Sequence, residues 1–183
     1  PQLAAIDGML ALRRGDADTA YSLLTIALQR LPNDTQPLYA LGFTYLQQGH
    51  LAFAEQAFRR VIENVPSSEN LRALIAELIH RQGRPDAAAD ELSLLLSDPK
   101  TAPPSYLRYA GQLRLAAGQP DQALALLRDA LSRQPRDPAT IGAILEAWRQ
   151  LDAVDDARAT LDAALATTSD CHELWWARVC LEE

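Results

Sequence analysis

The sequence predicts an all-α solenoid of repeated helix–turn–helix units along its 183 residues. Glycines recur about every 34 residues, a small residue follows each glycine five positions later, and a proline closes most units. A repeat of this length suits one pair of packed helices. Apolar residues between these marks recur at helical spacing, so about eleven helices and no strand are expected.

Three columns of residues keep one register along the chain. The glycine column contains Gly15, Gly49, Gly83 and Gly118, with Asp152 in the fifth place. The column of small residues contains Ala20, Ala54, Ala88, Ala123 and Ala157. The proline column contains Pro32, Pro66, Pro99 and Pro135, with Ser169 in the fifth place. Independent columns with one spacing indicate a repeat.

The second unit shows how each unit is built. Its first helix is predicted over about residues 36–48 and its second over about 51–64. Gly49 lies between them, where a backbone of positive φ ends the first helix. Gly42 lies inside the first helix, where a missing side chain lets the partner helix approach closely. Pro66 prevents the second helix from continuing.

The starts of the second helices carry carboxylates and prolines. An acidic residue in the first turn complements the positive end of the helix dipole. Proline suits the first helical position because no amide hydrogen is needed there. The residues concerned are Asp18, Asp86, Asp121, Asp155, Pro85 and Pro120. Much of the acidic charge therefore has a structural explanation.

These columns resemble the tetratricopeptide repeat family. The second unit matches that family's pattern through Leu38, Leu41, Gly42, Tyr45, Gly49, Ala54, Phe58 and Pro66. The resemblance implies one solenoid domain over 1–183, with five full repeats at about 1–34, 35–68, 69–103, 104–137 and 138–171 and the first helix of a sixth at 172–183. The chain starts without methionine and is interpreted as a fragment of a longer protein.

Composition and motifs argue against several classes of function. The net charge of −7 opposes binding to nucleic acid, and no apolar run is long enough to cross a bilayer. No motif of a catalytic, cofactor or metal site is present, and the three histidines do not cluster with cysteines at ligand spacing. We therefore expect a non-enzyme without cofactor or metal, and no membrane insertion of this fragment.

The resemblance implies a binding groove lined by first helices. Carried over position by position, the groove residues fall into an apolar and a polar set. The apolar set, which includes the neighbouring polar residues Arg13 and Gln47, is Met9, Leu12, Arg13, Tyr39, Phe43, Leu46 and Gln47. The polar set is Glu77, His80, Arg81, Arg108, Tyr109, Gln112, Glu146, Arg149 and the aromatic Trp176.

Each group of groove residues also has a structural interpretation. Phe43 could serve contact with a neighbouring helix, and Trp176 could belong under a further helix. The arginines of the polar set, Arg108 and Arg149, could be held in ion pairs with Glu77 and Glu146. These alternatives stay open at the level of sequence.

The leading functional prediction is a scaffold that binds a partner protein or peptide in this groove. An anionic polymer is the second candidate ligand. One alternative is a periplasmic repeat region of a bacterial exopolysaccharide export or pilus-assembly protein, which recruits a modifying enzyme or guides polymer. Another is an accessory repeat region of a glycosyltransferase. The compartment is left between periplasm and cytoplasm of a bacterium, with the periplasm favoured.

Overall fold

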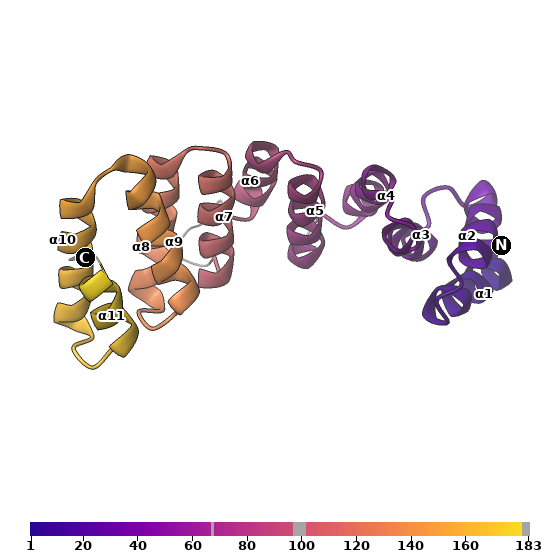
Figure 1. Ribbon diagram of the computed structural model, residues 1–183. Helices are drawn as coiled ribbons and strands as arrows, with labels where there is room; N and C mark the ends of the chain where they lie inside the picture. The colour runs from indigo at the N-terminus through magenta and orange to yellow at the C-terminus, as the bar shows by residue number, and fades with distance from the viewer. Residues whose placement is uncertain (67, 97–101, 181–183) are drawn as a thin grey trace. The chain divides into compact units, whose positions relative to one another are not determined.

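The computed structural model describes residues 1–66, 68–96 and 102–180. This part of the chain contains eleven α-helices, one short 3-10 helix and no strand (Figure 1). The predicted all-α fold of paired helices is therefore confirmed. The chain divides into two compact units, Pro1–Glu91 and Leu92–Glu183, and each is described separately below.

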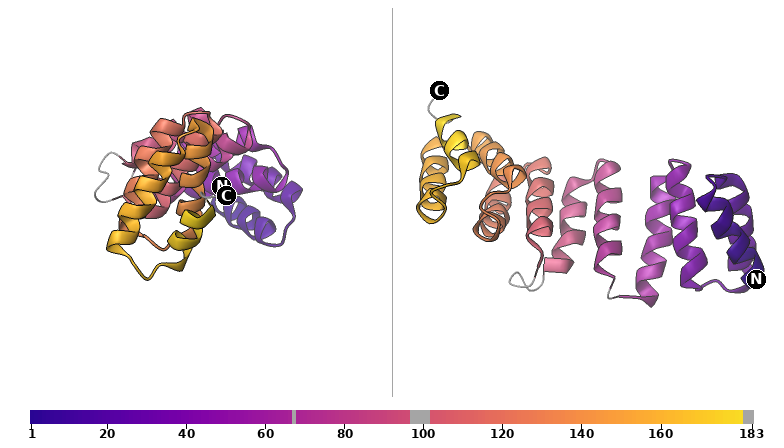
Figure 2. Two further views of the ribbon diagram at one scale, coloured as in Figure 1. Left: turned by 60° about the vertical axis from the view of Figure 1, so that its left-hand side comes forward. Right: turned by 90° about the horizontal axis from the view of Figure 1, so that it is seen from below.

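The first unit is a series of antiparallel helices in which each helix packs against the next along the chain. The view from below in Figure 2 shows these indigo to magenta helices side by side. Its helices are α1 (Gln2–Arg13), α2 (Ala17–Arg30), α3 (Thr35–Gln47), α4 (Leu51–Asn64) and α5 (Glu69–Arg81). Helix α6 (Pro85–Ser93), which continues as the 3-10 helix Leu94–Leu96, begins in this unit and ends in the next.

The second unit repeats the same arrangement. Its helices are α7 (Pro104–Ala116), α8 (Pro120–Arg133), α9 (Pro138–Leu151), α10 (Val154–Thr167) and α11 (His172–Cys180). The first helices of successive repeats also contact one another, α7 with α9 and α9 with α11. In the first unit α1 and α3 are in contact in the same way. Each unit therefore has a face made of first helices.

The predicted helix signals lie where the sequence placed them. Asp18, Asp86, Asp121 and Asp155 all lie in the first turn of a second helix. Three further aspartates cap helices with their side chains, each accepting a backbone N–H within the first turn: Asp16, Asp34 and Asp137. These seven of the 24 acidic residues therefore stabilise helix starts.

The fifth glycine position is the exception in the turn column. Gly49 ends its helix with a φ of 77°, and the other glycines of this column adopt similar values. Asp152 occupies the equivalent turn after α9 with a φ of 52°, which is the left-handed region. An L-residue with a side chain is strained in this region, although aspartate tolerates it better than most.

Glycine inside the first helices permits close contact with the second helices. A Cβ on Gly42 would lie 2.4 Å from a ring carbon of Phe58, a side chain with no exposed surface. Gly8 meets Leu24 in the same way, and Gly111 meets Leu127. The large residue opposite each glycine therefore fills the space that the glycine leaves. Each of these large residues lies four positions after an alanine of the repeat column, such as Ala54 before Phe58.

A buried carboxylate links helix α4 to the turn between α5 and α6 in the first unit. Glu55 of α4 is only 7% exposed. Its oxygens lie 2.9 Å from Arg59 and 2.6 Å from Arg84, and it accepts a hydrogen bond of 2.8 Å from Gln82. Arg84 and Gln82 belong to the turn between α5 and α6, so this network links adjacent repeats.

The two kinds of helical glycine predict opposite effects of one substitution. Gly42→Ala should lower the free energy of unfolding by about 1–3 kcal/mol, because Phe58 must move. Gly142→Ala, in α9, should raise it by up to about 1 kcal/mol, because a Cβ there meets no atom within 4 Å and alanine favours the helix. Urea unfolding of both variants measures these changes in the free energy of unfolding. Changes of the same sign in the two variants would contradict the packing described here.

The strained turn predicts a second reciprocal pair. Asp152→Gly should stabilise the protein by about 0.5–1 kcal/mol, because glycine adopts positive φ without steric cost. Gly49→Ala should destabilise it by a similar amount for the same reason. Thermal unfolding of the two variants tests this, and a loss of stability in Asp152→Gly would show that the aspartate side chain contributes more than its strain.

Candidate functional site

An exposed aromatic group lies on the first-helix face of the first unit. Tyr39 of α3 is 45% exposed and packs edge-to-face on Phe43, with ring centroids 4.9 Å apart. Both rings contact Phe58 of α4, at 5.8 Å and 5.2 Å. Phe43 is half-buried, so it shares its surface between this contact and solvent. Tyr39 is therefore an accessible ring on a rigid aromatic base.

The other residues of the apolar set surround this group to different degrees. Met9 and Leu12 pack partly against the core cluster of α1, α2 and α3, so only part of each side chain is accessible. Leu46 is half-buried, and Arg13 and Gln47 are exposed. The amide of Gln47 donates a hydrogen bond of 3.5 Å to the carbonyl oxygen of Leu12. The structure thus brings the apolar set together within one unit.

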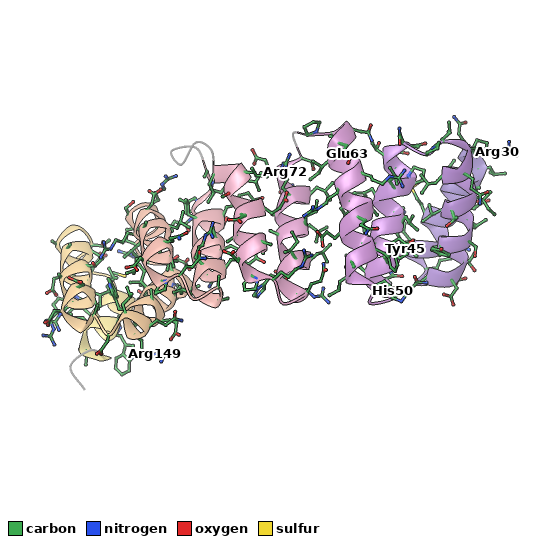
Figure 3. All side chains as sticks on the ribbon, turned by 90° about the horizontal axis from the view of Figure 1, so that it is seen from above. Arg30, Tyr45, His50, Glu63, Arg72 and Arg149 are labelled. Carbon is green, nitrogen blue, oxygen red and sulfur yellow. The ribbon has the colours of Figure 1, made fainter. Side chains whose placement is uncertain are left out.

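A second aromatic group lies beside the turn between α3 and α4, where Tyr45 and His50 are close together (Figure 3). The ring of Tyr45 lies 5.8 Å from that of Tyr21 and 5.4 Å from that of Phe53. Burial, and then the neighbouring Tyr21, raise the pKa of the Tyr45 phenol above its ordinary value. Phe53 and Tyr21 belong to second helices, and this group was not among the predicted site residues.

The polar set begins on α5 in the first unit. Glu77 and His80 are half-buried there, whereas Arg81 is exposed. The Nδ1 atom of His80 is buried and has no hydrogen-bond partner within the described residues. His80 is therefore more enclosed than the solvated groove histidine that its sequence position suggests.

Arg108 of α7 is held by a carboxylate of the same unit. Its Nε atom lies 3.2 Å from Oδ2 of Asp137, which also caps α9. In the described part of the chain this Nε is buried and has no hydrogen-bond partner. The contact is therefore electrostatic. Tyr109 on the next position is half-buried.

Arg149 forms the ion pair with Glu146 that the sequence analysis left open. Two nitrogens of Arg149 lie 2.8 Å and 2.6 Å from the two oxygens of Glu146, a bidentate pair, and Gln150 adds a hydrogen bond of 3.0 Å. These hydrogen bonds, that of Arg149 first, lower the pKa of Glu146 to about 2. Glu146 also lines a shallow depression between α7 and α9 together with Gln112.

Trp176 lines a deeper pocket on the first-helix face of the second unit. The pocket lies between α9 and α11 and encloses about 410 Å³. Its lining residues are Pro138, Ile141, Gly142, Leu145, His172, Glu173, Trp176 and Ala177. Trp176 itself is 67% exposed, so most of its surface is accessible to solvent.

Gly142 could have been found from the repeat register. Counting by repeats, it occupies the groove position that holds Tyr39, Arg108 and Trp176 in other repeats. The pocket includes the position at which this register has no side chain. The other repeats carry Ala5, Tyr39, Ala73, Arg108 and Trp176 at this register, so the signal in the sequence is the one position without a side chain.

A further cavity of about 420 Å³ lies between the second helices α8 and α10. Its lining is largely apolar, with Arg128, Ser132, Thr160 and Thr168 as polar members. Arg128 also lies 6.0 Å above the ring of Trp148, which is fully buried in α9. This cavity is on the side away from the predicted groove residues.

No group of three or more histidine, cysteine or acidic side chains among the described residues is arranged to hold a metal ion. Within the same residues, every helix is too short or too polar to traverse a lipid bilayer. Buried Cys171 lies 3.3 Å from a carboxylate oxygen of Glu173.

The Glu146–Arg149 pair predicts a measurable titration. The pKa of Glu146 is depressed, so its stabilising effect is complete above the ordinary value of 4.5 and is lost as the pH falls through about 2. An NMR titration of this carboxyl should give a midpoint near 2 at low salt. Arg149→Gln should move the midpoint back toward 4.5, and an unchanged midpoint would contradict the pairing in solution.

Solved structures share this fold at low sequence identity. A crystal structure of the MamA protein aligns with a TM-score of 0.72 at 19% identity, covering 90% of each chain. A tetratricopeptide repeat protein from Parabacteroides merdae aligns with a TM-score of 0.71 at 16% identity, covering 98% of this chain and 71% of that one. MamA from Desulfovibrio magneticus RS-1 gives 0.69 at 16%, covering 92% and 96%. Identity at this level establishes the fold alone.

The family is established by sequence. No curated protein matches the chain. The sequence model described as "Tetratricopeptide repeat" matches residues 11–78 and 114–178, which together make up more than half of the chain. These segments contain most of the glycine and alanine columns, with Gly83 and Ala88 between them, and most of the helices described above. The chain belongs to the tetratricopeptide repeat family.

Proposed function

We propose that the chain is a scaffold that binds a partner protein or peptide through the first-helix faces of its repeats. The observation that carries the proposal is the aromatic group of the first unit, where Tyr39 is exposed on a rigid base of Phe43 and Phe58. Tyrosine on such a base offers a large contact area at low entropic cost, which is typical of binding hot spots. Membership of a repeat family that presents extended binding surfaces supports it.

Within this proposal the two units contribute different chemistry. The first unit offers apolar and aromatic surface through Tyr39, Phe43 and Leu46. The second offers paired charges through Arg108 and Arg149. Because the Arg149 pair is exposed, exchanging Glu146 for an acidic group of a partner would cost little. An acidic segment of a protein is therefore the ligand we propose there, with an anionic polysaccharide as the less favoured one.

The proposal includes no catalytic step. The tetratricopeptide repeat is an interaction fold, and we keep the absence of enzymatic activity, cofactor and metal as predictions from sequence. Activity would have to come from another part of a longer protein. The face of first helices is sufficient for recognition, because binding requires only exposed complementary surface.

A matched pair of aromatic substitutions tests the proposed face. Peptides selected from a random phage-displayed library against the chain should lose about tenfold or more in affinity for Tyr39→Ala, since a central aromatic anchor contributes about 2 kcal/mol or more. Phe53→Ala is the control, because Phe53 is 54% exposed but lies on the second helix α4. Isothermal titration of the synthesised peptides measures both.

Circular dichroism of both variants must show unchanged helix content, so that a loss of affinity reports binding. Equal losses in the two variants, or a loss only in Phe53→Ala, would place the binding surface outside the first-helix face. A melted Tyr39→Ala variant would show that the aromatic group is structural.

A further inference from the structure

We propose that the pocket between α9 and α11 holds the side chain of an arginine from a partner peptide. The inference deepens the proposed function, on which it rests, by naming the residue recognised at one position of the first-helix face. It depends on three observations: a glycine without a structural reason, an exposed indole beside it, and a carboxylate at the edge of the pocket.

Gly142 lacks the reasons that explain the other glycines. Its φ is not in the left-handed region, so no turn requires it. A Cβ would meet no atom within 4 Å, whereas at Gly42 it would collide with Phe58. Glycine weakens a helix interior relative to alanine. At Gly142 the space that a side chain would occupy is open, and Gly142 lines the pocket of about 410 Å³.

The walls of the pocket suit a long side chain with an apolar stem. Ile141 and Leu145 of α9 form one side, and Trp176 of α11 forms the other. Trp176 is largely exposed, so its indole can be covered by a ligand without displacing a protein neighbour. Arginine carries three methylene groups that pack on apolar walls while its guanidinium stays near water. Its planar cation also stacks on a tryptophan face.

The charge at the edge of the pocket favours a cation. Glu173 lines the pocket, and hydrogen bonds from its own backbone N–H and from Cys171 lower the pKa of its carboxyl, so it is ionised at neutral pH. The nearby Arg136 is neutralised by its ion pair with Asp170. His172 is the remaining titratable residue of the lining. Glu173 is therefore the source of negative charge in the pocket lining.

The geometry points to arginine more than to lysine. A guanidinium can donate two parallel hydrogen bonds to a carboxylate such as Glu173 and remain flat against Trp176 at the same time. An ammonium group is a more strongly hydrated point charge and gains less from the indole. The pocket lining does not include Arg108 or Arg149, so the acidic segment proposed for those residues would carry one arginine at this position.

The test uses a short acetylated and amidated peptide of alanine and serine with one central arginine. It is titrated into the ¹⁵N-labelled protein, and the indole N–H signal of Trp176, assigned with Trp176→Phe, is followed. This signal should shift saturably. Trp175 is an internal control, because its indole N–H donates a hydrogen bond of 3.0 Å to the carbonyl oxygen of Ser169.

Matched changes in peptide and protein isolate each wall of the pocket. Citrulline in place of arginine keeps the shape and removes the charge, and should bind about tenfold more weakly, as expected for a lost charged hydrogen bond. Glu173→Gln should weaken the arginine peptide by the same factor and leave the citrulline peptide unaffected. Gly142→Leu should abolish the Trp176 response by filling the pocket, with Gly142→Ala intermediate.

Four results would overturn the inference. They are equal affinity for arginine and citrulline, unchanged affinity in Gly142→Leu, tighter binding of a peptide with glutamate at the centre, and no response of Trp176. If Tyr39-dependent peptides still bind while Trp176 does not respond, the pocket assignment alone fails. If neither responds, the proposed binding function fails with it. If Gly142→Leu does not fold, the affinity of Glu173→Gln for the arginine and citrulline peptides tests the inference instead.

Discussion

The close contact between the two helices of a repeat is the constraint on which the rest of the structure depends. Gly8, Gly42 and Gly111 each face a large residue of the following helix, at a distance that leaves no space for a Cβ. Because the pair is closed on this side, each first helix turns its remaining surface toward the first helices of neighbouring repeats or toward solvent. The binding face is therefore a by-product of how the pairs pack.

Most of the fold could be predicted because its signals are local. Helical periodicity, a glycine at a turn and an aspartate in a first turn depend on residues a few positions apart, and helices such as α4 begin and end where these signals lie. The repeat multiplies each signal, so that Asp152 could be assigned to a glycine position although its side chain is unusual there.

The details of the candidate site depend on packing between helices and were less accessible. The partner of Arg149 is Glu146, three positions away on its own helix, and the sequence analysis named it as one alternative. The carboxylate beside Arg108 is Asp137, at the start of the next first helix, and only the packed structure shows that the two meet. The pocket at Gly142 could not be predicted from reactive or aromatic side chains, because it forms where a side chain is absent.

The buried carboxylate of Glu55 has a consequence for how the first unit unfolds. Arrays of repeats generally lose structure one repeat at a time, because each repeat contacts only its neighbours. Here Glu55 on α4 is paired with Arg84 beyond α5 and accepts a hydrogen bond from Gln82, so detaching the third repeat would break both contacts and leave Glu55 with only Arg59 of its own helix. That loss raises the energy of partly unravelled states. Residues of α4, α5 and the start of α6 should therefore exchange their amide hydrogens as a single cooperative group.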